Sequence, residues 1–327
     1  MTIKNAIFVF IFLLLLTLVS PRVKFKNEFI KVKVPNKLEE LDQYLLIGES
    51  KFNLEENTKK EIIWHGNKEQ TEYSVVYFHG FASSKNGIYP VPNNIAKALN
   101  ANIFFTRFKG HGIDEKDAFK GVQTQDWLRD IDEAIQIGKL IGKKLIIIGT
   151  SNGGAAAIWA LENYPNEIHS ATLISPNIYP KDKRTSLIYY PWGRQLAYLA
   201  TGGYNKFETK ESKKIEHEVV KTFHTEWQQV DSIIAMMGLV KLINSHGFAR
   251  ITTPMMIIYP PRDPTVDSSK INQFISEYGG YKEEIPITLV ESDHSHVPVG
   301  NHSHRSAQNT SYFTKYVVAF IKKIKSK

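Results

Sequence analysis

Short apolar runs alternate with helical patterns along most of the chain, and this alternation is the strongest constraint on its fold. The runs are rich in β-branched and aromatic residues and mostly apolar on both faces: EIIWH (61–65), SVVYFH (74–79), NIFFT (102–106), LIIIGT (145–150), ATLIS (171–175), MMIIY (255–259) and ITLVE (287–291). Strands without a polar face are typical of a parallel sheet that is covered on both sides. We therefore expect an α/β fold.

One interval breaks the alternation. Residues 176–254, between ATLIS and MMIIY, are too many for a simple crossover and are rich in aromatic side chains. The sequence therefore predicts a helical lid insertion over about residues 177–250. The main domain is expected to cover 60–327, preceded by a lead-in helix and linker over 27–59.

Residues 1–26 form a hydrophobic segment of their own. Residues 6–19 carry no charge, and as a helix they reach only about 21 Å of a roughly 30 Å hydrocarbon core. That length suits a signal peptide, but no A-x-A-like site follows and Pro21 disfavours cleavage after Ser20. We expect a single N-terminal membrane anchor, with the body on either side of the membrane. Secretion after signal cleavage is the alternative.

Composition excludes several classes of function. The chain has no cysteine, which excludes disulfides, thiolate zinc sites and a cysteine nucleophile. Its net charge is +8, but the lysines are scattered and no nucleic-acid motif accompanies them. We expect no nucleic-acid partner, and the oligomeric state is left open.

A serine stands where one of the apolar runs ends. In LIIIGTSNGGAAA, Ser151 is flanked by Gly149 and Gly153 and followed by a helical pattern of small residues. The glycines leave room for a sharp strand-to-helix turn, in which a strained serine holds its hydroxyl clear of the sheet. We interpret Ser151 as a nucleophile. The alternative is a plain turn or a phosphate loop, although neither GxxxxGK[ST] nor GxGxxG is present.

The run SVVYFHGFASS suggests how an oxyanion would be stabilised. Its strand is expected beside that of the serine, and Gly80 lets a backbone N–H turn toward the hydroxyl. We assign the oxyanion hole to the backbone N–H groups of Phe81 and Asn152. His79, and His111 in TRFKGHGID, precede the serine in chain order and are expected to be structural.

A nucleophilic serine needs a general base that is oriented by a carboxylate. Asp263 directly follows the strand MMIIY, whereas Asp267 suits the N-cap of the next helix. The loop after ITLVE offers His294, His296, His302 and His304. We select Asp263 and His296, since His296 lies several residues beyond the strand, and keep His294 as the alternative base. A histidine metal cluster is a further interpretation, but the spacing of a helical metal motif is missing.

The order Ser151, Asp263, His296, preceded by HGF and interrupted by the insertion, resembles the α/β-hydrolase family over about residues 60–325. FTRFKGHG, GTSNGG and SHVPVG resemble its monoglyceride-lipase and carboxylesterase-like branch. The resemblance implies an α/β-hydrolase fold with a mostly parallel eight-stranded sheet, helices on both faces and a helical lid. It also implies a serine hydrolase that needs no cofactor and cleaves lipid-like or medium-chain carboxylic esters through an acyl-enzyme intermediate.

Two other functions remain open at the level of sequence. An amidase or peptidase of the same fold would carry the same residues, because the preference for a leaving group depends on the lid. A catalytically silent binding module is also conceivable, but such a protein has no need of a strained serine.

Overall fold

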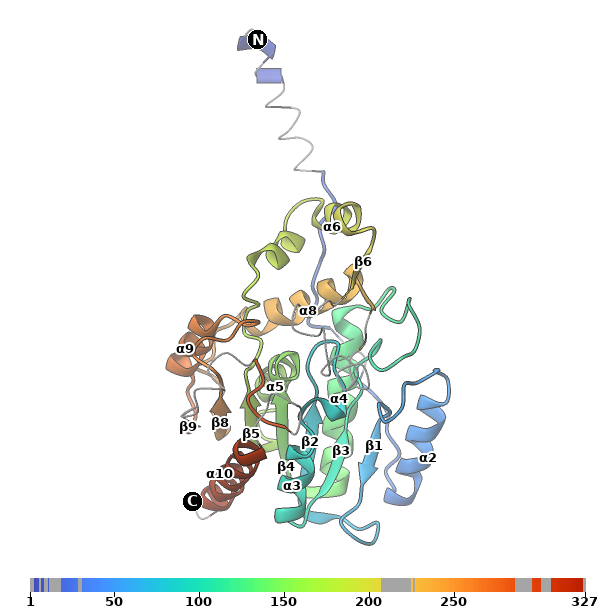
Figure 1. Cartoon of the computed structure of the whole chain (residues 1–327), viewed down its shortest axis with the longest axis vertical. Coiled ribbons are helices and arrows are strands. Elements are labelled where there is room, and N and C mark those ends of the chain that lie inside the picture. The colour runs from blue at the N-terminus through green and yellow to red at the C-terminus, as the bar shows by residue number, and fades with distance from the viewer. Residues whose placement is uncertain are drawn as a thin grey trace.

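A seven-stranded sheet forms the centre of the computed structural model, which describes residues 3–5, 7–8, 11, 19–28, 31–206, 225, 227–285, 296–300 and 307–325 (Figure 1). Its strand order is β1 (Glu61–Ile63), β3 (Asn102–Phe105), β2 (Thr71–Phe78), β4 (Gly142–Thr150), β5 (Ile168–Ile174), β8 (Met255–Ile258) and β9 (Lys282–Glu284). Only the β1–β3 pair is antiparallel among these strands. The prediction of an α/β fold with a mostly parallel sheet is confirmed.

The expected and observed strands differ at one edge of the sheet. The run at 287–291, which was predicted to be a strand, lies outside the described residues. The polar segment β9 was not predicted, because it is a short edge strand whose side chains remain partly in contact with water. The sheet therefore has seven strands in the described part of the chain, where the resemblance implied eight.

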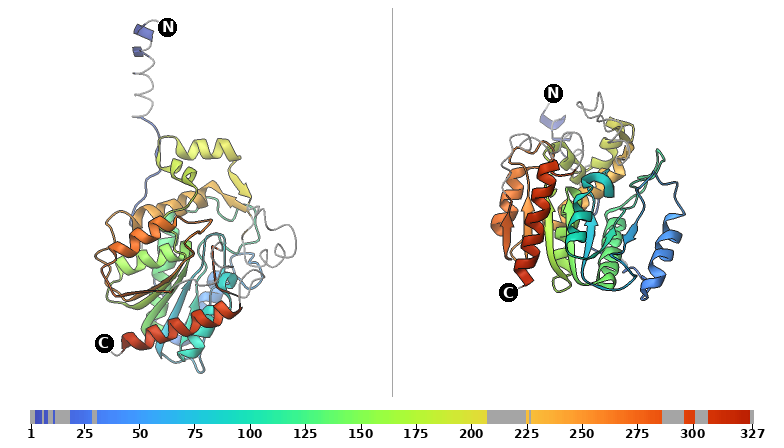
Figure 2. Two further views of the ribbon diagram at one scale, coloured as in Figure 1. Left: turned by 60° about the vertical axis from the view of Figure 1, so that its left-hand side comes forward. Right: turned by 60° about the horizontal axis from the view of Figure 1, so that its bottom comes forward.

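Helices cover both faces of the sheet (Figures 1 and 2). One face packs against α3 (Val91–Ala98) and α10 (Ala307–Lys325), and the other packs against α4 (Thr124–Ile141), α5 (Asn152–Asn163) and α8 (Val230–Ile243). Side chains of β2 alternate between the two cores: Val76 and Phe78 enter the α4–α5 core, whereas Val75 and Tyr77 enter the α3–α10 core. Both faces of the central strands are thus buried, which explains their lack of a polar face.

A buried ion pair holds the lead-in helix α2 (Leu38–Glu49) to the sheet. Arg107, which follows β3, donates to both carboxylate oxygens of Glu49 over 2.7 Å, and both side chains are buried. Burial alone would raise the pKa of Glu49, but the hydrogen bonds and charge of Arg107 outweigh it and hold this pKa below its ordinary value. This contact fixes the loop 106–112 beside the carboxyl ends of the strands.

The interval predicted as a lid contains η2 (Lys183–Tyr189), α6 (Gly193–Thr201), a two-stranded antiparallel ribbon of β6 (Tyr204–Lys206) and β7 (Trp227–Gln229), and α8. Residues 207–224 lie outside the described residues. Helix α8 packs on α4 and α5 with Ala235, Met237 and Leu239 fully or almost fully buried. It therefore belongs to the main core, and η2 and α6 lie on the outer side of it (Figure 2).

The N-terminal hydrophobic segment is described only in part. The described residues among positions 3–11 are helical, and Ile3, Ile7, Phe8 and Ile11 are exposed. Most of the predicted span 6–19 lies outside the described residues. Within the part of the chain that is described, no helix is both long and apolar enough to cross a membrane.

Candidate active site

Ser151 occupies a sharp turn between β4 and α5. Its backbone has φ 54° and ψ −117°, a conformation that L-residues rarely adopt and that costs of order 1–3 kcal/mol. The glycines on either side allow close backbone contact. A Cβ on Gly149 would lie 2.5 Å from the carbonyl oxygen of Gly153, and one on Gly153 would collide with the carbonyl of Phe78 on β2. The turn therefore exists only because two side chains are missing.

The structure brings Ser151, His296 and Asp263 into one hydrogen-bonded chain. The Nε2 atom of His296 lies 2.8 Å from the Ser151 hydroxyl oxygen. Its Nδ1 atom lies 2.9 Å and 3.1 Å from the two carboxylate oxygens of Asp263. This arrangement suits proton transfer from the hydroxyl to the imidazole, with the carboxylate fixing the orientation and tautomer of the ring.

Asp263 is held rigidly in its own turn. Its side chain is fully buried, and one carboxylate oxygen accepts hydrogen bonds from the backbone N–H groups of Thr265 (2.7 Å) and Val266 (2.9 Å). Backbone donors of this kind compensate the burial of a carboxylate. The turn after β8 thus fixes the acceptor for the imidazole.

The alternative acid is placed elsewhere. Asp267 is the N-cap of α9 (Ser268–Glu277), where it accepts from the N–H of Ser269 over 3.1 Å and pairs with Lys183. Hydrogen bonds from Lys183 and Ser269 lower the pKa of Asp267 to about 2. The side chain of Asp267 therefore binds residues of α9 and η2. The alternative base His294, with His302 and His304, lies outside the described residues.

The predicted oxyanion loop passes close to the serine. A Cβ on Gly80 would lie 3.4 Å from the Cβ of Ser151, so the loop backbone approaches the hydroxyl directly. Asn152 is the first residue of α5, where backbone N–H groups have no partner within the helix. A developing negative charge beside Ser151 would face this helix N-terminus. The donor roles of Phe81 and Asn152 remain a prediction.

Two buried histidines lie behind the oxyanion loop. The Nδ1 of His79 lies 2.9 Å from the Gly80 carbonyl oxygen, and its Nε2 accepts from the N–H of Phe108 over 3.1 Å. His111 stacks edge-on against His79 with ring centroids 4.8 Å apart. Burial and the neighbouring His79 lower the pKa of His111 well below its ordinary value, so it stays neutral. These contacts agree with structural roles for both rings.

One contact to the loop could not be anticipated from the sequence. The backbone N–H of Thr225 donates to the Ala82 carbonyl over 2.8 Å, and its hydroxyl accepts from the N–H of Gly112 over 3.1 Å. Thr225 thus joins the inserted segment to the loop after β2 and to the loop 106–112. No sequence motif surrounds this threonine, so its role becomes visible only in the folded structure.

The described residues contain no group of three or more histidine, aspartate or glutamate side chains that could hold a metal ion. The carboxylate and imidazole nearest to the serine are already bonded to each other.

Comparison with known proteins identifies the family. Residues 73–320 match the family model of the alpha/beta hydrolase fold, which covers most of the chain. The protein therefore belongs to the α/β-hydrolase family, as the sequence motifs indicated. No match was found among curated protein sequences.

Solved structures with a similar fold include several lipolytic enzymes. A structure reported for LipS and LipT, two metagenome-derived lipolytic enzymes, has a TM-score of 0.62 at 17% identity and covers 83% of this chain and 99% of its own. The Paleococcus ferrophilus monoacylglycerol lipase has a TM-score of 0.59 at 13% identity, with 81% and 98% covered. The Saccharomyces cerevisiae monoglyceride lipase has a TM-score of 0.59 at 14% identity, with 81% and 91% covered. At these identities the similarity establishes the shared fold.

Gly153→Ala should destabilise the turn that carries Ser151, because the new methyl group would collide with the Phe78 carbonyl. We expect the free energy of unfolding to fall by about 1–3 kcal/mol or more, as for overpacked core sites. The matched control is Gly48→Ala in α2, where a Cβ meets nothing within 4 Å. Urea denaturation of the two variants measures the difference, and equal stability would contradict the proposed contact.

Proposed function

We propose that this protein is a serine hydrolase that cleaves carboxylic esters. The observation that carries the proposal is the hydrogen-bonded chain from the Ser151 hydroxyl through His296 to the buried carboxylate of Asp263. A strained serine at a strand-to-helix turn is typical of a nucleophile, because the turn holds its hydroxyl where a substrate can reach it.

In the proposed mechanism, Ser151 attacks the ester carbonyl while His296 removes the hydroxyl proton. Asp263 stabilises the imidazolium, and the backbone N–H groups of Phe81 and Asn152 stabilise the oxyanion. The imidazolium then returns its proton to the leaving alcohol, leaving an acyl group on Ser151. A water molecule, deprotonated by His296, releases the acid and restores the serine.

Ser151→Ala should abolish both ester hydrolysis and labelling by a fluorophosphonate probe. The rate constant kcat should fall on the order of 10⁶-fold, because the nucleophile is lost while the core is unchanged. Ser175→Ala is the matched control: Ser175 follows the neighbouring strand β5, also has a positive φ, and its hydroxyl has no hydrogen-bond partner among the residues that the structure describes. A folded Ser151→Ala protein with near-normal turnover would refute the proposed nucleophile.

Asp263→Asn should lower kcat by about 10⁴-fold, because an amide cannot hold the imidazole in the required tautomer. Asp267→Asn is the matched control, since this carboxylate caps α9 and does not contact His296. We expect nearly normal kcat for Asp267→Asn, with at most a modest loss of stability. Steady-state kinetics on a soluble ester separate the two variants, and equal losses would argue against Asp263 as the orienting acid.

We further propose that the preferred esters are lipid-like or carry medium-length acyl chains. Support comes from the aromatic side chains of the inserted segment and from the lipolytic enzymes among the proteins of similar fold. A hydrophobic pocket gains about 0.8 kcal/mol per buried methylene. Therefore kcat/KM should rise from acetyl to octanoyl p-nitrophenyl esters. A steady fall along this series, or faster cleavage of aminoacyl amides, would favour a different substrate class.

We also propose that the N-terminal segment anchors the protein to a membrane. Residues 6–19 are uncharged, and the basic residues that follow can lie at lipid headgroups. The full-length protein should remain with membranes in high salt, because salt screens charge but does not weaken apolar burial. Sequencing of the mature N-terminus supplies the control: a start near residue 21 or beyond would show a cleaved signal peptide instead.

A further inference from the structure

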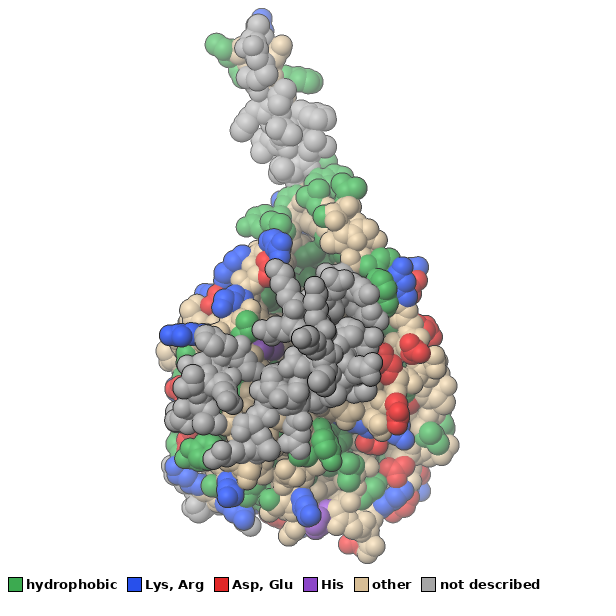
Figure 3. All heavy atoms as spheres, viewed as in Figure 1, with side chains coloured by type: hydrophobic (Ala, Val, Ile, Leu, Met, Phe, Trp, Pro, Cys, Tyr) green, Lys and Arg blue, Asp and Glu red, His purple; other side chains and the backbone are tan. Residues whose placement is uncertain are grey.

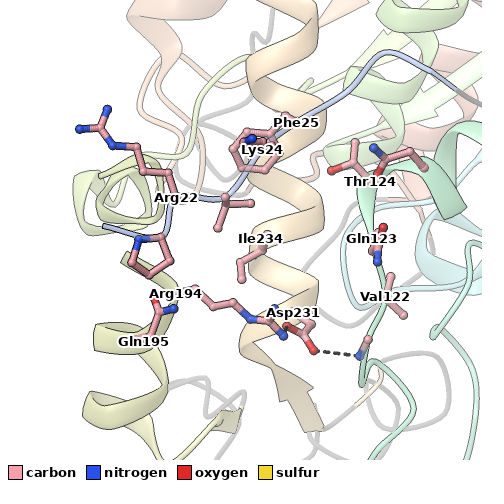
Figure 4. Close-up of a pocket in the computed structure, with 14 residues that line it drawn as sticks. Arg22, Lys24, Phe25, Val122, Gln123, Thr124, Arg194, Gln195, Asp231 and Ile234 are labelled. Carbon is pink, nitrogen blue, oxygen red and sulfur yellow. Dashed lines mark hydrogen bonds and ion pairs between the residues drawn. The ribbon is translucent and has the colours of Figure 1, made fainter. Parts of the chain in front are cut away.

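Helix α6 exposes its two leucines to solvent, while Ala197 and Tyr198 of the same helix pack on the body. Leu196 and Leu199, one turn apart, are 59% and 83% exposed. Arg194, whose side chain is half exposed, donates to the buried carboxylate of Asp231 over 2.9 Å (Figure 4). A surface helix normally buries its leucines, so the outer side of α6, which exposes both of them, is suited to an apolar environment.

Further apolar side chains extend this surface next to α6. Together they form the α6 face, which we define as Leu187, Tyr190, Trp192, Leu196 and Leu199, all at least 40% exposed. Exposed apolar residues are common when scattered, but these five come from one short stretch of chain. Figure 3 shows apolar side chains gathered where the N-terminal segment leaves the body.

Residues 21–27 form a strap that joins the N-terminal segment to this face. The carbonyl of Pro21 accepts from the N–H of Trp192 over 3.0 Å. The ring of Phe25 packs edge-on against Tyr189 at 5.7 Å, and the side chain of Asn27 accepts from the indole of Trp159 over 2.7 Å. The N-terminal segment therefore leaves the body directly beside the α6 face.

Side chains of the strap alternate between inward and solvent-exposed positions, as expected for an extended chain. Val23 and Phe25 turn inward and pack on the small apolar cluster formed with α8, whereas Arg22 and Lys24 are exposed (Figure 4). Beneath the strap lies a cavity of about 350 Å³, and Arg194 reaches Asp231 along its wall. Exposed cations at the border of an apolar face complement the negative surface of a bilayer.

We infer that the α6 face and the strap form one surface that docks on a lipid bilayer, with Leu196 and Leu199 inserted among the lipids. We choose a bilayer as the partner of this surface because the strap is continuous in sequence with the apolar residues of the N-terminal segment. Val19, at the junction between them, is 77% exposed. The inference rests on the membrane anchor proposed above but not on catalysis. It adds an orientation, since the inserted segment would face the bilayer and the opposite end with α3 would face water (Figure 1).

Site-specific fluorescence tests this orientation in the full-length protein. The chain has no cysteine, so Leu199→Cys, Phe8→Cys and Lys97→Cys each carry one bimane label without further changes. Each position is exposed, so folding is not at risk. The proteins are reconstituted in phosphatidylcholine and phosphatidylglycerol vesicles whose acyl chains are brominated, and bromine quenches only labels that enter the hydrocarbon. Lys97 on α3 is the control at the far end.

We expect the labels at Phe8 and Leu199 to lose most of their fluorescence and the label at Lys97 to lose none. Quenching at Phe8 without quenching at Leu199 would overturn the docking surface while leaving the anchor intact. Disulfide cross-linking between unlabelled Leu199→Cys copies, without quenching, would assign the face to a dimer and also overturn the inference. Hydrolysis of a soluble ester by the same samples reports separately on the proposed activity.

Discussion

The close backbone contact between α5 and the central strands is the constraint on which the site depends. Because Gly149 and Gly153 have no side chains, the first turn of α5 can approach the carbonyl of Phe78 on β2. That approach forces Ser151 into its strained conformation and places it beside Gly80 of the neighbouring loop. The cost of strain in one residue is offset by a core that buries nearly all of α5.

Three other loops depend on this arrangement. The turn after β8 offers the Asp263 carboxylate, the segment at 296–300 offers the imidazole, and the β2 loop passes next to the hydroxyl. In parallel sheets the carboxyl ends of the strands lie at one edge, so residues far apart in the chain meet there. The buried pair of Arg107 and Glu49 and the contact of Thr225 with Ala82 stabilise the surrounding loops.

The sequence predicted the elements with strong local patterns. The central strands were recognisable because both of their faces are apolar, and the turn at Ser151 because the glycines stand where side chains would collide. Strand β9 was missed, since an edge strand exposed to water has no such pattern. The strap and Thr225 were also missed, because their roles arise from contacts with segments far away in the chain. Local periodicity carries no information about such contacts.

The strap has a practical consequence for any shortened form of the protein. The sequence-based division between residues 1–26 and 27–59 suggests cutting the chain near Asn27, but the carbonyl of Pro21 and the ring of Phe25 belong to the folded body. Removing them would leave the N–H of Trp192 without its acceptor and uncover Tyr189 and the cluster around Ile234. A soluble form that preserves the native surface should therefore begin before Pro21. The folded domain therefore starts at Pro21, the first residue of the strap that contacts the body.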